Sequence, residues 1–129
     1  MQSEDIDGRT LETMTVEEVA EAWEQNRIVL IDVRTPPEYM MEQIGGAMLM
    51  PMASFDPDKL PSQMGKRIVL MCGSGVRSGK MAKLALEGGL DRIAHMEGGF
   101  AAWKKAGQPY IGVEMATGAP KKVAGSTAC

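Results

Sequence analysis

Cysteine and histidine are both scarce in this chain of 129 residues. The two cysteines stand at positions 72 and 129, and the single histidine is His95. Two cysteines so far apart form neither a disulfide framework nor a CxxC metal-binding motif. We therefore expect no structural disulfide and no metal site of that kind. In a reducing cytosol, an unpaired thiol is instead a candidate for chemistry.

Long apolar runs and an excess of positive charge are also missing. The longest apolar stretches, at 28–31 and 68–72, are far shorter than the roughly 20 residues needed to span a bilayer. The N-terminus is acidic and no apolar segment follows it, so we expect no export signal, no membrane partner and a cytoplasmic protein. A net charge of -3 leaves no general basic surface for a phosphate backbone, so nucleic acid is not an expected partner.

The residues that are present suit one soluble domain. Hydrophobic residues make up 44% of the chain and charged residues 24%, which is ordinary for a globular protein. From position 112 onward the composition shifts to Gly, Ala, Thr, Ser and Lys, which is typical of a tail or linker. We expect an N-terminal arm over 1–12 that leads into a short strand near 11–14, one domain over 13–110 and a flexible C-terminal tail over 111–129.

Short apolar runs alternate with helical patterns along the expected domain. Thr15 and Glu18 have the spacing of a capping box, and the apolar periodicity after them predicts a helix through Glu24. The apolar runs predict strands at 28–31, 47–50, 67–71 and 93–96, with helical segments between them and a last helix from Gly99 through Trp103. This alternation favours an α/β fold with a mainly parallel sheet and helices on both faces.

The loop after the predicted strand at 67–71 carries the strongest chemical signal. A cysteine at this point, Cys72, lies at the carboxyl edge of the sheet, where open α/β proteins bind ligands. Gly73 and Gly75 allow the backbone to curl with its N–H groups pointing inward, which creates a nest for an anion. The positive end of the following helix, expected from near Ser78, and the charge of Arg77 both lower the pKa of a thiol. We therefore expect Cys72 to be a reactive nucleophile.

At this point the residues resemble the rhodanese-like sulfurtransferases, over about residues 13–110. The resemblance rests on the loop 72–78 and on three further blocks, at 32–39, at 44–51 and at 97–109. It implies a five-stranded, mainly parallel sheet flanked by helices on both faces, and the family's nucleophile maps onto Cys72. One block departs from the family pattern: Glu42-Gln43 stands where the family usually has Gly-His before the Ile-x-Gly-Ala motif.

The resemblance also implies the chemistry. The related phosphatases and arsenate reductases need seven residues from Cys to Arg, whereas Cys72 to Arg77 is a loop of six counted inclusively. The smaller loop suits one transferred sulfur, whose negative charge backbone N–H groups would stabilise. We expect a sulfane sulfur donor, with thiosulfate preferred, a Cys72 persulfide, and cyanide, a thiol or an acceptor protein as acceptor. The expected substrate-binding residues are those of the loop: Gly73, Ser74, Gly75, Val76, Arg77 and Ser78. No metal or organic cofactor is required.

Two alternatives stay open beside this reading. Cys72 to Val76 resembles the start of the loop in 3-mercaptopyruvate sulfurtransferases, although those usually have Thr where this chain has Arg77, and they have two domains. A non-catalytic rhodanese-like module that binds a partner protein usually lacks the cysteine that this chain keeps. Because a cation in the loop suits the sulfonate of thiosulfate, thiosulfate remains the preferred donor.

Several other residues have plainer interpretations. We expect Arg34 and Glu38, four apart, to form an internal ion pair, and His95 to be structural in the last strand. We expect the clustered methionines to fill the core rather than to bind a soft metal; they are Met40, Met41, Met48, Met50 and Met52. Cys129 is either an inert thiol or a second thiol that attacks the Cys72 persulfide or forms a reversible disulfide with Cys72.

Overall fold

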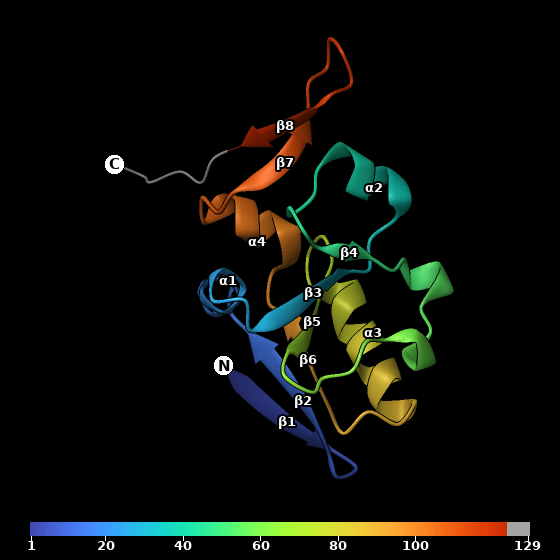
Figure 1. Cartoon of the computed structure of the whole chain (residues 1–129). Helices are drawn as coiled ribbons and strands as arrows, with labels where there is room; N and C mark the ends of the chain where they lie inside the picture. Colours follow the sequence, from blue (N-terminus) through green and yellow to red (C-terminus); the bar gives the residue numbers. More distant parts are fainter. Residues whose placement is uncertain (124–129) are drawn as a thin grey trace.

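The computed structural model of the chain describes residues 1–123 and contains a six-stranded sheet with helices on both sides (Figure 1). The strand order is β1-β2-β6-β5-β3-β4, and every neighbouring pair is parallel except β1 with β2. The strands are β1 (Gln2–Ile6), β2 (Arg9–Met14), β3 (Ile28–Asp32), β4 (Met48–Leu49), β5 (Arg67–Met71) and β6 (Arg92–Met96). The expected α/β class with a mainly parallel sheet is confirmed, with six strands in place of five.

Helices α1 (Val16–Glu24) and α4 (Gly99–Lys105) cover one face of the sheet, and α3 (Val76–Glu87) covers the other. Alternate residues of each strand point to opposite faces. In β5, Val69 belongs to the core cluster under α1 and α4, whereas Ile68 and Leu70 belong to the cluster under α3. We call the second side of the sheet the α3 face. The strand alternation decides which side chains can reach α3.

The capping box predicted at Thr15 is confirmed, and a second capping box begins α2. At α1, the Thr15 side chain accepts from the backbone N–H of Glu18 while the Glu18 side chain accepts from that of Thr15. The same reciprocal pair, Thr35 with Glu38, begins the short helix α2 (Pro36–Met41). Each capping box satisfies two backbone donors that a helix start leaves without partners. Two 3-10 turns, Met52–Ser54 and Pro57–Lys59, follow β4.

The short strand expected near 11–14 is present as part of β2, but the residues before it do not form a loose arm. Residues 2–14 form an antiparallel hairpin in which β1 pairs with β2 and adds a sixth strand to the sheet. Asp7 and Gly8 make its turn with φ angles of 51° and 84°. An Asp-Gly pair suits a two-residue turn in which both central residues have positive φ. This Asp-Gly pair is the signal that could have predicted the hairpin.

The structure also differs from the expected tail for the residues it describes beyond 110. Here β7 (Tyr110–Val113) and β8 (Pro120–Val123) form a separate antiparallel hairpin. Gln43 and Ile111 exchange two backbone hydrogen bonds, which join this hairpin to the segment after α2. The ring of Tyr110 packs edge-on against Phe100 of α4 at 5.6 Å. Cys129 lies outside the described residues, so its expected roles stay predictions.

The methionines expected in the core lie mostly at the surface. Met40, Met41, Met48 and Met52 are exposed, and only Met50 of this group packs against the core. The expectation that they fill the core is therefore wrong for these four, because α2, β4 and the 3-10 turn that contains Met52 lie at the rim of the sheet. Within residues 1–123, no three His, Cys, Asp or Glu side chains gather as a metal-binding group. No helix in the same range has the length and apolar composition to cross a membrane.

A buried ion pair fixes the chain where β3 ends. Asp32 and Arg34 are both buried, and the Arg34 guanidinium donates to the Asp32 carboxylate through Nε at 3.0 Å and Nη2 at 2.8 Å. Arg34 Nη2 also donates to the carbonyl of Glu42, and the guanidinium lies 4.5 Å from the centre of the Phe100 ring. The expected Arg34–Glu38 pair is thus wrong: Arg34 turns inward toward β3, α4 and the end of α2.

Replacing Arg34 should strongly destabilise the fold. Arg34→Met leaves the Asp32 carboxylate buried without its cation, and breaking such a pair costs about 3–5 kcal/mol. Urea unfolding followed by tryptophan fluorescence measures the free energy of unfolding. Asp91→Asn is the control, because Asp91 is fully exposed and its contact with Arg9 is 3.8 Å long. We expect the control to change the free energy by less than about 0.5 kcal/mol. An equal change in the free energy of unfolding for Arg34→Met and Asp91→Asn would contradict a structural role for the buried pair.

Candidate active site

Cys72 stands directly after β5, at the carboxyl edge of the sheet. In the sheet, β5 lies between β3 and β6. The alternation along β5 places the Cys72 side chain with Ile68 and Leu70 on the α3 face, where it is buried. The chain then runs through three residues and enters α3 at Val76. Arg77 and Ser78 therefore belong to the first turn of α3, which begins two residues earlier than the sequence predicted. The position predicted for Cys72, directly after a strand at the carboxyl edge of the sheet, is confirmed.

Gly75 turns the loop back toward the sulfur. Its φ of 99° is in the left-handed region, and it is the residue that caps α3. A Cβ at this position would lie 3.2 Å from the backbone nitrogen of Gly98, so a side chain would also crowd the neighbouring loop. The backbone N–H of Gly75 donates to Cys72 Sγ at 3.0 Å. This inward N–H is the arrangement that the two loop glycines predicted.

The N-terminal turn of α4 holds the same loop from behind. The backbone N–H of Phe100 donates to the carbonyl of Cys72 at 2.7 Å, and that of Ala101 donates to the carbonyl of Gly73 at 3.0 Å. Gly99 permits this approach: a Cβ there would lie 2.4 Å from the carbonyl oxygen of Cys72. From the sequence, Gly99 was expected only to begin a helix, and both glycines belong to a block shared with the family. The contact depends on residues distant in the sequence, so no local pattern could indicate it.

Opposing effects act on the pKa of the Cys72 thiol. Burial raises it, because desolvation disfavours the charged thiolate. Hydrogen bonds from the backbone N–H and hydroxyl of Ser78 and from the backbone N–H groups of Ser74 and Gly75 lower it and outweigh the burial. The net pKa lies below the ordinary value for a cysteine. Because the thiolate is the nucleophilic form, the site can present a reactive sulfur.

Arg77 does not point freely into solvent but pairs with Glu38 of α2. Its Nη1 and Nη2 donate to the two carboxylate oxygens of Glu38 at 2.8 and 3.0 Å. The hydrogen bonds from Arg77 are the largest cause of a Glu38 pKa lowered to about 2. The guanidinium passes over Gly73, where a Cβ would lie 3.1 Å from Nη2. Sequence reasoning paired Glu38 with Arg34 because helical spacing shows only local partners.

His95 lies closer to the loop than the sequence predicted. Its Nδ1 is 3.1 Å from the hydroxyl oxygen of Ser78, which is itself 3.6 Å from Cys72 Sγ. Ser78 is fully buried, and its hydroxyl also donates to the carbonyl of Gly75 at 3.3 Å. The strand alternation that places Ile93 on the α3 face also places His95 there, which was a usable signal. Of the remaining loop residues, Ser74 and Val76 are exposed at the rim.

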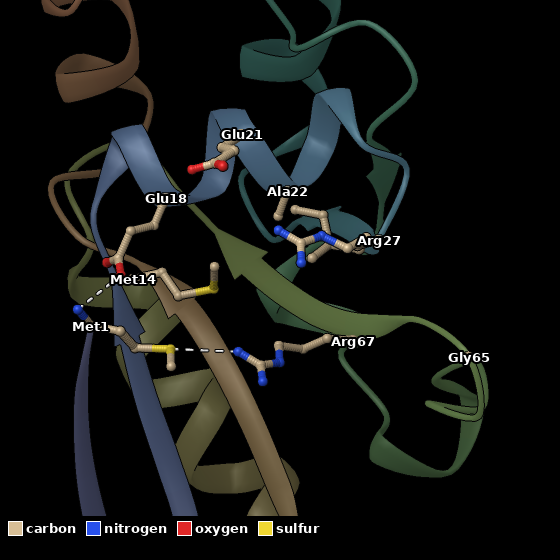
Figure 2. Close-up of a pocket in the computed structure, with 9 residues that line it drawn as sticks. Met1, Met14, Glu18, Glu21, Ala22, Arg27, Gly65 and Arg67 are labelled. Atoms are coloured by element: carbon tan, nitrogen blue, oxygen red, sulfur yellow. Dashed lines mark hydrogen bonds and ion pairs between the residues drawn. The ribbon is translucent and has the colours of Figure 1, made fainter.

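A hollow elsewhere on the molecule is separate from this loop. Its volume is about 410 Å³, and Figure 2 shows residues of its lining, among them Met1, Glu18, Arg27 and Arg67. The N-terminal amine pairs there with Glu18, and Arg67 donates to the sulfur of Met1 (Figure 2). The hollow lies beside α1, and its lining includes no residue from the 72–78 loop. The candidate chemistry thus lies in a backbone loop at the edge of the sheet and not in this hollow.

Comparison with known proteins identifies a family over most of the chain. Residues 15–106 match the model of the rhodanese-like domain. An uncharacterized protein of Synechocystis is 40% identical over 88 residues, which are 68% of this chain and 49% of that protein. A sulfurtransferase of Allochromatium vinosum is 29% identical over 87 residues, covering 67% of this chain and 81% of that protein. The chain spans only 49% or 26% of the length of the first curated relatives that it matches.

A solved structure agrees with the fold described above. The rhodanese-like domain protein from Staphylococcus aureus superposes with a TM-score of 0.61 and is 32% identical in sequence. The superposition covers 71% of this chain and 90% of that chain.

The Glu38–Arg77 pair should make stability depend on pH in an acidic window. Because folding lowers the Glu38 pKa from 4.5 to about 2, the pair stabilises the fold above pH 4.5 and loses this effect as pH falls to about 2. Both side chains are partly exposed, so we expect at most about 1 kcal/mol. The measurement is the difference in unfolding free energy between wild type and Glu38→Gln from pH 7 to pH 2. Glutamine still suits the Thr35 capping box. A difference in unfolding free energy that does not shrink in acid would contradict the pairing. As a control, Glu38→Gln introduced into Arg77→Met should change the unfolding free energy little at any pH.

Proposed function

The chain belongs to the rhodanese-like domain family, and on that premise we propose that it is a sulfurtransferase that carries sulfur as a Cys72 persulfide. The observation that carries this proposal is the environment of the sulfur. Cys72 Sγ lies at the carboxyl edge of the sheet, accepts from the Gly75 N–H at 3.0 Å, and has a lowered pKa. These features favour a thiolate, and the same donors can stabilise the charge of a persulfide.

The proposed reaction has two displacement steps. The Cys72 thiolate attacks the sulfane sulfur of thiosulfate, a Cys–S–S bond forms, the donor S–S bond breaks, and sulfite leaves with the electron pair. The acceptor, cyanide or a thiolate, then attacks the outer sulfur of the persulfide. This step gives thiocyanate or a new persulfide and returns the Cys72 thiolate. No oxidant, metal or organic cofactor enters either step, and the free thiol suits a reducing compartment such as the cytoplasm.

Arg77 supports thiosulfate as the donor. Its guanidinium crosses the loop at Gly73, and it has five N–H donors, of which Glu38 accepts two along Nη1 and Nη2. The others can bind a sulfonate oxygen at the entrance to the loop. Besides binding Arg77, Glu38 carries a negative charge that repels an incoming anion such as thiosulfate. The pair thus holds Arg77 in position while weakening its attraction for the donor.

Thiosulfate should add the mass of one sulfur atom to Cys72, and dithiothreitol should remove it. Intact-protein mass spectrometry with peptide mapping measures both changes. Cys72→Ser should lose the added mass and reduce thiosulfate:cyanide activity to background, because serine lacks the thiol that the first step needs. Cys129→Ser is the matched control and should retain both. If Cys72→Ser keeps full activity, the nucleophile assignment is wrong. Incubation with 3-mercaptopyruvate in place of thiosulfate tests the alternative donor.

Substitutions at Arg77 and Glu38 should change thiosulfate use in opposite directions. Arg77→Ala removes a charge-assisted contact of about 1.5–3 kcal/mol, which lowers kcat/KM roughly 10- to 100-fold. Glu38→Gln removes the opposing charge but keeps the helix cap, so we expect kcat/KM to rise about two- to fivefold. Steady-state rates with thiosulfate measure both effects. Alkylation of Cys72 by neutral iodoacetamide is the control: it needs no anion site, so Arg77→Ala should slow it less than it lowers kcat/KM for thiosulfate. An unchanged kcat/KM in Arg77→Ala would rule out donor binding by Arg77.

A further inference from the structure

A row of hydrogen-bonding side chains runs from β2 across β6 to the sulfur. Thr13 Oγ1 lies 3.3 Å from His95 Nε2, and His95 Nδ1 lies 3.1 Å from Ser78 Oγ. Ser78 Oγ is in turn 3.6 Å from Cys72 Sγ. Thr13 lies in β2 and His95 in the neighbouring strand β6. Cys72 follows β5, and Ser78 belongs to the first turn of α3. The sulfur chemistry proposed above uses only the last two of them.

Sheet register and a helix glycine build this row. Thr13 and His95 are direct partners in the parallel pairing of β2 with β6, so both side chains point to the α3 face. Gly79, the residue after Ser78, faces the imidazole: a Cβ there would lie 3.3 Å from His95 Cε1. Glycine inside a helix is less favourable than alanine. Here it leaves the space that the ring needs to reach Ser78.

The hydroxyl of Ser78 has one proton and several competing acceptors. The thiolate of Cys72, the carbonyl of Gly75 and a bare Nδ1 of His95 can each accept it. If His95 carries its proton on Nε2, then Nδ1 takes the Ser78 proton and the buried thiolate loses that donor. If the proton is on Nδ1, Ser78 accepts from His95 and keeps its own proton for the sulfur. Thr13 can then donate to Nε2, so every donor in the row points toward the negative charge.

We propose that His95 is a positioning residue for the Cys72 thiolate: its Nδ1–H donates to Ser78 and thereby directs the Ser78 hydroxyl at the sulfur, while Thr13 supports this tautomer by donating to Nε2. The inference rests on the proposed function only in taking Cys72 as the reactive sulfur. A charged acceptor attracts the hydroxyl more strongly than the Gly75 carbonyl does. The row therefore favours the thiolate without placing a charged base beside it.

The charges around the imidazole agree with a neutral ring. Burial lowers the pKa of His95, the Glu97 carboxylate acts against this, and Lys83 of α3 adds to the lowering. Near pH 7 the ring thus carries one ring proton, and the negative charge of the thiolate favours that proton on Nδ1, from which it donates toward the sulfur through Ser78. This is why the tautomer, rather than the net charge of His95, decides what Ser78 can donate.

The decisive measurement is the Cys72 thiol pKa, obtained from the pH dependence of alkylation by iodoacetamide. His95→Leu should raise this pKa by about half a unit to one unit, the effect of losing one hydrogen bond. His95→Asn should recover at least half of the shift, because its amide N–H can replace Nδ1–H. Thr13→Val, which keeps the shape and the β-branch, should shift the pKa in the same direction by a smaller amount. Thr13→Ser should restore the wild-type value.

A double-mutant cycle separates this role from a merely structural one. Ser78→Ala removes the intermediate hydroxyl, so in that background His95→Leu should cause no further shift. Three results would each overturn the inference. The first is a His95→Leu shift of the Cys72 pKa that persists in Ser78→Ala. The others are a His95→Asn shift as large as that of His95→Leu, and an unchanged Cys72 pKa in Thr13→Val. Alkylation needs no sulfur donor. Failure to form a persulfide with any donor would therefore refute the proposed function and leave this inference standing.

Discussion

Two hydrogen bonds from the first turn of α4 to the carbonyls of Cys72 and Gly73 hold the sulfur-bearing loop, and the rest of the site depends on them. A loop whose carbonyls are bound from behind has its N–H groups left to turn toward the sulfur. The left-handed Gly99 makes the contact possible by bringing its backbone against the loop. Cys72 thus owes its environment to backbone geometry more than to any charged side chain, and α3 can begin immediately behind it.

Much of the fold and the position of Cys72 could be predicted because the signals are local. The apolar run at 67–71, the two loop glycines and the helical pattern after them define a strand, a turn and a helix without reference to the rest of the chain. The capping box at Thr15 is similarly complete within four residues. Parallel pairing then follows from the alternation of such elements, since strands joined by helices return in the same direction.

The side-chain partners could not be predicted in the same way. Spacing suggested Arg34 with Glu38, but burial favours a bidentate pair with Asp32 two residues back, which satisfies both charges inside the core. Glu38 instead meets Arg77, 39 positions away in the chain. The contact between Ser78 and His95 likewise requires the register of the sheet and the packing of α3 upon it. Such contacts depend on three-dimensional placement, which single-sequence patterns do not encode.

The two edges of the sheet have a consequence for how the molecule behaves in a crowded solution. An edge strand presents unpaired N–H and C=O groups that can capture a strand from another chain. At one edge, β1 is exposed and carries Glu4 and Asp5, whose charges repel the edge of a second copy. At the other edge, β4 has only two residues, too few to template a new strand. The open sheet thereby resists edge-to-edge aggregation without closing into a barrel.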